Sequence, residues 1–299
     1  MTPAAGPARA PSPAPAGATA ATPARTTAAT PAPAPDRPGQ RLAWTVAALL
    51  SALLVVAPAT WQVWSYATAR SGTLSGGSGG RPVAALEIVG GDADVTVSPR
   101  GDGQVGYRAT IGWSLKAPTI EESWLGDTLR LTPHCPGEEF LPTLDAGCSV
   151  QLGVTVPEGI PVKVTAGSGH VLLSGLGGAV DAEVDSGRVD LAGLRGALRA
   201  KVGSGSLRAT GLTGTQAEIR VGSGRAEAVF VTPPDQVSAR VGSGHLALTV
   251  PAASRFRVRC EAGAGHCQVP DDMRDAGSSR RLDVEAGVGR AVAMYPAGP

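Results

Sequence analysis

The side chains of this sequence that are able to do chemistry include four cysteines, which fall into two local pairs. Cys135 lies close to Cys148, and Cys260 lies close to Cys267. In an exported domain such pairs predict disulfides, and a bridge that closes roughly 15 residues contributes about 3 kcal/mol. Metal binding is the alternative, because one histidine precedes Cys135 and another precedes Cys267. The spacing matches no standard zinc pattern, so we expect no metal site.

Groups suited to catalysis are present, but the sequence does not gather them. The histidines are His134, His170, His245 and His266. None has a serine or cysteine partner at a recognisable spacing, and the carboxylates Glu183, Asp185 and Asp190 are scattered among arginines and lysines. The glycine-rich turns lack the following helix that a phosphate cradle requires. We therefore predict a protein that is not an enzyme and that holds no cofactor.

A repeated phrase runs from Val162 to about Tyr295 and must position these groups. It occurs about seven times, in forms such as VKVTAGSGHVLLSGLGG and LRAKVGSGSLRATGLTG. The last glycines of its turns are Gly169, Gly187, Gly205, Gly224, Gly244, Gly265 and Gly289. Their spacing lengthens from 18 to 24 residues, which is typical of a stacked repeat in which each unit packs on its neighbours.

Apolar and polar residues alternate on both sides of each Gly-x-Gly turn, which predicts two strands per repeat with one inward face each. A second turn, Gly-Leu-x-Gly, recurs with Leu176, Leu194 and Leu212 in the same phase, so these leucines should fill a corner of the core. Segments 104–111, 128–132 and 149–157 also alternate and are expected to be capping layers. The sequence thus predicts an all-β fold, a single-stack parallel β-solenoid with rungs of about 18–24 residues.

The outward positions of the repeat carry charge in two columns. In the first, Lys163, Asp181, Arg199 and Glu218 alternate in sign, which predicts ion pairs between neighbouring strands. The second follows each turn and is mostly basic: His170, Arg188, Ser206, Arg225, His245, His266 and Arg290. The basic members form a candidate ligand column for an anionic polymer such as a wall polysaccharide or teichoic acid. A solvated edge without a ligand is the alternative.

The domain organisation follows from shifts in composition. Residues 1–41 are rich in proline and alanine and are expected to be a disordered cytoplasmic tail. Residues 42–66 form a charge-free apolar run with Trp44 and Trp61 near its ends, which predicts one transmembrane signal anchor. A cleaved signal peptide is the alternative, because the run contains an Ala-Pro-Ala sequence. Residues 67–81 then read as a Gly/Ser linker, and residues 82–299 as the extracellular domain.

The composition favours β-strands and argues against nucleic acid as a partner. Aromatic residues make up 4% of the chain, while glycine numbers 41 and proline 25, so the core must be built from valine, leucine and alanine. The net charge is +1, without the concentrated basic face of a nucleic-acid binder.

The phrases from Val162 to Val250, with the strand-like SVQLGVTVPEGIPVKV leading into them, resemble the bacterial putative-adhesin family of β-solenoid domains. That group includes membrane-anchored surface proteins of high-GC Gram-positive bacteria. The last two repeats depart from the pattern, with GAG and GVG in place of GSG. The resemblance implies adhesion and carries no catalytic motif.

These observations together predict a single-pass protein of the cell membrane, with its amino terminus in the cytoplasm and its carboxyl-terminal domain outside. The domain would be a non-catalytic, adhesin-like module that binds envelope polymers. The alternative hypothesis is an envelope-stress sensor or regulatory protein that signals through its cytoplasmic tail. The sequence identifies no protein partner.

Overall fold

The computed structural model describes residues 44–54, 56, 70–114, 116–135 and 148–296. It divides into two compact units, residues 1–55 and 56–299, and each is described by itself. In the first, residues 44–54 are helical, whereas residues 1–41 and most of the rest of the expected membrane span lie outside the described residues. Among the described residues, no helix has both the length and the apolar character needed to cross a bilayer.

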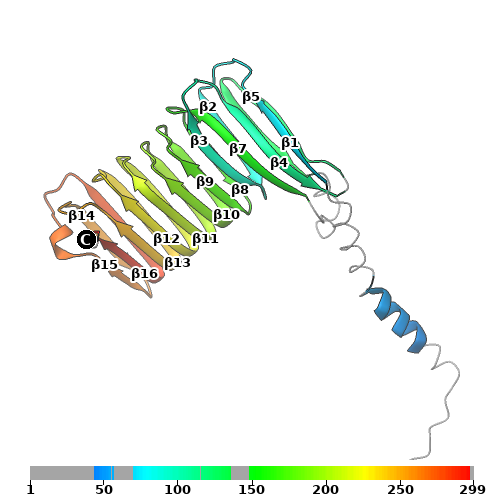
Figure 1. The fold of residues 1–299 in the computed structure, drawn as a ribbon. Coiled ribbons are helices and arrows are strands. Elements are labelled where there is room, and N and C mark those ends of the chain that lie inside the picture. Colours follow the sequence, from blue (N-terminus) through cyan, green and yellow to red (C-terminus); the bar gives the residue numbers. More distant parts are fainter. Residues whose placement is uncertain (1–43, 55, 57–69, 115, 136–147, 297–299) are drawn as a thin grey trace, which may run out of the picture. The chain divides into compact units, whose positions relative to one another are not determined.

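The second unit is built from β-strands (Figure 1). Those of its amino-terminal part are β1 (Arg70–Gly77), β2 (Ala85–Gly91), β3 (Asp94–Arg100), β4 (Gly106–Trp113), β5 (Thr119–Leu125), β6 (Thr128–His134) and β7 (Ser149–Pro157). The repeats supply β8 (Val162–Ala166), β9 (His170–Ser174), β10 (Val180–Ala192), β11 (Leu198–Leu212), β12 (Gln216–Phe230), β13 (Gln236–Thr249), β14 (Arg257–Ala262), β15 (His266–Gln268) and β16 (Arg281–Met294). A short 3-10 helix, η1 (Asp271–Met273), precedes β16.

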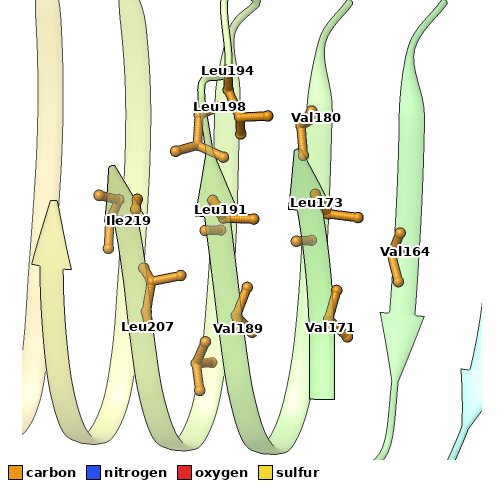
Figure 2. Close-up of a cluster of buried hydrophobic side chains, with 14 of the residues drawn as sticks. Val164, Val171, Leu173, Val180, Val189, Leu191, Leu194, Leu198, Leu207 and Ile219 are labelled. Atoms are coloured by element: carbon orange, nitrogen blue, oxygen red, sulfur yellow. The ribbon is translucent and has the colours of Figure 1, made fainter. Parts of the chain in front are cut away.

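The repeats stack in parallel and in register. We use the word rung for the strand segments on both sides of one glycine turn, for example β8 and β9 around Gly169 or β11 around Gly205. Turn glycine lies beside turn glycine, so that Gly205 pairs with Gly187 on one side and with Gly224 on the other. Figure 2 shows each strand curving at its turn, so that its two halves face each other across the core.

The core consists of the inward columns that the alternation predicts. Val189 and Leu191 from one half of β10 lie with Val180 from its other half between the two layers (Figure 2). These side chains are at most 2% exposed. The turn leucines Leu176, Leu194 and Leu212 are buried as well, which confirms that they close one corner of the core.

The carboxyl-terminal rungs do not stack in the order of the sequence. We expected successive repeats to be neighbours, but β16 lies between β13 and β14, and it pairs with β15 as well. The inward residues explain this order. Leu282 and Val284 of β16 are buried on both sides by neighbouring rungs, whereas Val258 and Cys260 of β14 are half-buried at the end of the stack. The rung with the weaker apolar face therefore occupies the end position.

A cap covers the core beside the end rung. Phe256 and Met273 are fully buried there, and the Phe256 amide donates to the Met273 carbonyl at 2.9 Å. The Tyr295 hydroxyl donates to the Ser254 carbonyl, also at 2.9 Å. The segment 271–280 is part of this cap because the buried side chain of Met273 anchors it.

The amino-terminal end makes the sheet mixed, so the prediction of an entirely parallel stack is wrong there. Strands β6 and β7 form a rung that pairs in parallel with β2 and β3. Beyond it, β5 pairs with β6, β4 with β7 and β1 with β4, and all three pairs are antiparallel. The reversed strands leave side chains at this end partly exposed, among them Tyr107, Trp113 and Trp124.

Residues 70–77 are not the flexible linker that their glycines and serines predicted. They form β1, which pairs with β4 from Arg70 opposite Trp113 to Gly77 opposite Gly106. The glycines serve packing, because a Cβ at Gly72 would lie 3.1 Å from the Trp113 ring. Small residues in this strand let the aromatic side chains of β4 close the end of the core.

Both predicted cysteine pairs form disulfides. Cys135 is bonded to Cys148 and Cys260 to Cys267, with Cα–Cα separations of 6.1 and 5.9 Å. One bridge joins the end of β6 to the start of β7, and the other joins β14 to β15. Facing sheets normally lie about 10 Å apart, so the end rung narrows at its turn to bring Cys260 and Cys267 together.

Tyr107 closes the amino-terminal end of the core, and we expect it to titrate unusually. Its hydroxyl donates to Glu122 Oε1 at 2.5 Å, and burial, together with this carboxylate, raises the pKa of Tyr107 to about 12. The fold favours the neutral phenol, so this stabilisation is complete below pH ~10, the pKa of an unfolded tyrosine, and is lost as the pH rises towards 12. Spectrophotometric titration should show an ionisation near pH 12 that Tyr107→Phe removes and Tyr295→Phe leaves in place. Ionisation of Tyr107 near pH 10 would contradict this expectation.

Candidate functional site

The predicted ligand column exists as one continuous row on the outer face of the second half of each rung. Pairing places its members side by side in the order His170, Arg188, Ser206, Arg225, His245, Arg290 and His266. We call this set the basic row; apart from the half-buried Ser206, its side chains are exposed. Arg290 lies inside the row and His266 at its end, because β16 is inserted before β15. With neighbouring strands about 4.8 Å apart, the row is about 29 Å long.

The arginines of the basic row are unpaired, unlike Arg199 and Arg240 on the other outer face. In the part of the chain that the structure describes, Arg188, Arg225 and Arg290 form no ion pair. Exposed guanidinium groups along one face favour an anionic ligand, because no carboxylate in the described ranges forms an ion pair with them.

The charges on the first half of the rungs pair with one another. Lys163 lies 3.5 Å from Glu87, and Arg240 lies 3.0 Å from Glu285. In the predicted alternating column, Arg199 lies 3.6 Å from Glu218, which confirms that ion pair. Asp181 lies beside Lys163 and Arg199 in the register, but among the described residues it forms no ion pair with either. The two outer faces therefore differ in degree: the second-half face also holds an ion pair, Arg208 with Glu227 at 3.7 Å, but it leaves Arg188, Arg225 and Arg290 without one.

His170 stands apart from the rest of the row because carboxylates hold it. Its Nε2 lies 2.6 Å from Asp190 Oδ2, and its amide donates to Asp94 Oδ1 at 2.9 Å. Ser168, two residues earlier, donates its hydroxyl to Asp92 instead of to the imidazole. The nearby serine is therefore not activated by the histidine.

Among the described residues, no three His, Cys, Asp or Glu side chains lie close enough together to hold a metal ion. Between β2 and β3, Asp92 and Asp94 accept hydrogen bonds from Ser168 and His170 in the turn of the next rung, so these two carboxylates already have protein partners.

A second polar feature, which we did not predict, is a trough beside the amino-terminal end of the basic row. It has a volume of about 430 Å³ and crosses the outer surfaces of β3, β7 and β4. Its lining is Asp94, Thr96, Arg108, Thr110, Gln151, Leu152, Gly153 and His170. A neighbouring depression of about 400 Å³ shares Thr96, Arg108 and Gly153 with it, so the two are continuous.

Comparison with known proteins yields likeness of fold alone. No family model matches the sequence, and no curated protein matches it. A crystal structure of a putative cell adhesion protein from Clostridium sporogenes is 13% identical, with a TM-score of 0.35, over 76% of this chain and 100% of that one. A putative adhesin from Bacteroides fragilis is 15% identical, with a TM-score of 0.38, over 75% and 97%. A putative lipid binding protein from Parabacteroides distasonis is 12% identical, with a TM-score of 0.32, over 76% and 97%.

Similarity at this level does not determine what the chain binds. The three organisms are not those that the sequence resemblance suggested, so an origin in high-GC Gram-positive bacteria stays a prediction.

One signal for the trough was present in the sequence. In SVQLGVTVP, Gly153 occupies an outward position in the middle of a strand, far from any turn. A glycine at such a position leaves the outer face without a side chain, which lets a ligand or another backbone approach the strand closely. Arg108 could not be connected with it, because an antiparallel β4 beside β7 was not foreseen.

Proposed function

We propose that this chain is a non-catalytic, adhesin-like protein of the cell surface that holds an anionic polymer along the basic row. Its repeats form a β-solenoid whose parallel register sets cationic side chains at the spacing of the strands. The observation that carries the proposal is the row of unpaired arginines, Arg188, Arg225 and Arg290, on one outer face of the stack. A linear polyanion matches a linear array of cations better than a compact anion does.

The proposed location is outside the cytoplasmic membrane, with the chain anchored through residues 42–66 and its amino terminus in the cytoplasm. The two disulfides support export, because such bonds persist in oxidising compartments and are rare in the cytosol. Wall polysaccharides and teichoic acids carry the negative charge that the basic row would meet there.

Neutralising the row tests this function. We expect the double variant Arg225→Gln, Arg290→Gln to bind a galacturonate oligomer and polyphosphate about tenfold more weakly than the wild-type full chain at low salt. Both side chains should lie against the polymer, and isothermal titration measures the loss.

The matched control removes the same charge from the opposite face. Arg199→Gln with Arg240→Gln deletes two arginines that are already paired with Glu218 and Glu285. This variant should change the affinity less than about twofold, because paired surface charges contribute little outside their pair. Equal losses in the two double variants would show that only net charge matters and would refute a defined binding row.

A further inference from the structure

Gly153 is a glycine that the fold does not require. It lies in the interior of β7, where glycine costs about 0.5–1 kcal/mol relative to alanine. Its φ is not among the positive values that the turn glycines adopt. A Cβ at this position would meet only the Arg108 carbonyl oxygen, at 3.5 Å, which is an ordinary contact. Neither backbone conformation nor packing therefore accounts for the missing side chain.

Gly153 forms the floor of the trough, because it has no side chain to fill the space above the strand. Gly153 pairs with Thr96 of β3 on one side and with Arg108 of β4 on the other. Two residues earlier on the same face, Gln151 pairs with Asp94 and Thr110. Polar side chains thus surround the space above Gly153, and a larger side chain at position 153 would occupy that space.

The groups at the rim combine donors and acceptors. Thr96 and Thr110 offer hydroxyls, Gln151 an amide and Asp94 a carboxylate. Within the described residues, Arg108 forms neither an ion pair nor a side-chain hydrogen bond. A bare phosphate uses donors alone, whereas a sugar ring presents hydroxyls that both donate and accept. The mixture at this rim fits a sugar better.

The trough meets the basic row at His170. This residue lines the trough, and it lies next to Arg188 in the row. A chain that crosses Gly153 can therefore continue over the unpaired arginines without leaving the sheet surface. A rim of mixed donors and acceptors at one end and cations along the rest match a polymer built of sugars that also carry negative charge.

We propose that the trough over Gly153 binds one sugar unit of an acidic polysaccharide whose charged continuation lies along the basic row. The continuation rests on the function proposed above, whereas the trough itself stands on its own geometry. The class of ligand is thereby narrowed from polyanions in general to polyanionic glycans.

The test fills the trough without unfolding the protein. Gly153→Val in the full chain places a β-branched side chain on the floor, and its melting temperature should stay the same or rise, since valine favours strands. The control is Ala247→Val on β13. Ala247 occupies the position equivalent to Gly153, because strand pairing connects the two residues through one outward row: Thr96, Leu172, Asp190, Arg208 and Glu227. Three probes are titrated: a galacturonate oligomer, a heparin-derived oligosaccharide and polyphosphate of comparable charge.

We expect Gly153→Val to lower the affinity for at least one of the two oligosaccharides about tenfold or more. The affinity for polyphosphate should change less than about twofold. Ala247→Val should leave all three affinities unchanged. An equal loss for polyphosphate, no loss for either oligosaccharide, or an equal effect of Ala247→Val would each overturn the sugar site. The proposal that the basic row binds polyanions would still hold if the double variant Arg225→Gln, Arg290→Gln lowers the affinity for polyphosphate. Failure of the wild type to bind any probe would overturn both proposals.

Discussion

Replacing Gly224 with alanine should destabilise the domain by more than about 4 kcal/mol, which is an exceptional loss for a single added methyl group. Gly224 has a φ of +129°, a conformation essentially restricted to glycine. Its added Cβ would also overlap the carbonyl oxygen of Gly205 in the neighbouring rung. The same overlap recurs between Gly205 and Gly187 and between Gly244 and Gly224, so the backbone cannot relax without breaking the register of the stack.

A second glycine of the repeat separates these two causes. Gly193 also has a positive φ, +62°, but a Cβ there would approach nothing closer than 4.0 Å. Gly193→Ala should therefore cost only the strain of the left-handed conformation, about 1–2 kcal/mol. Urea unfolding followed by circular dichroism measures both variants. If Gly224→Ala folds and loses no more stability than Gly193→Ala, the close approach of the turns does not limit the stack.

The same two kinds of glycine show why much of the fold was predictable. The alternation around Gly205 is a local property of the chain, and it correctly placed Val202 and Leu207 in the core. The repeat of identical turns then set the register, because any other alignment of Gly187 with Gly205 would bring a Cβ into the close approach. Local rules of side-chain direction and glycine geometry thus determined the parallel part of the domain.

The order of the rungs and the ends of the stack were not predictable in this way. Periodicity assigns β14 and β16 the same inward columns, and only the burial available at an end position distinguishes Cys260 from Val284. Likewise, β1 has the composition of a linker, and its role depends on Trp113, which is distant in sequence.

The candidate site shows the same division between local and tertiary information. The basic row followed from counting along each repeat, although Arg290 and His266 changed places. The trough required Arg108 from an antiparallel strand that pairs with β7 only in the folded sheet. Sequence patterns therefore find sites built from equivalent positions of a repeat, and they miss sites built where the repeat ends.

Phe256→Ala is expected to cost about 3–5 kcal/mol and to loosen one end of the stack before the rest. Phe256 is fully buried, and its amide and carbonyl hold the cap through Met273 and Asp275. In a stack where each rung contacts only its neighbours, an open end should destabilise β14 and β16 first and leave β10 protected. Hydrogen exchange resolved by strand measures this gradient.

Phe230→Ala is the matched control, because Phe230 is 3% exposed and lies at the end of β12, in the middle of the stack. Its removal should lower protection in β12 and its neighbours β11 and β13, and less so in β14. The two variants should differ because each rung is stabilised mainly by its immediate neighbours. Hydrogen exchange should therefore be fastest in the strands next to the substituted residue. If Phe256→Ala instead lowers protection equally in β10, β14 and β16, the stack unfolds as one cooperative unit, and the cap contributes to global stability without protecting an end.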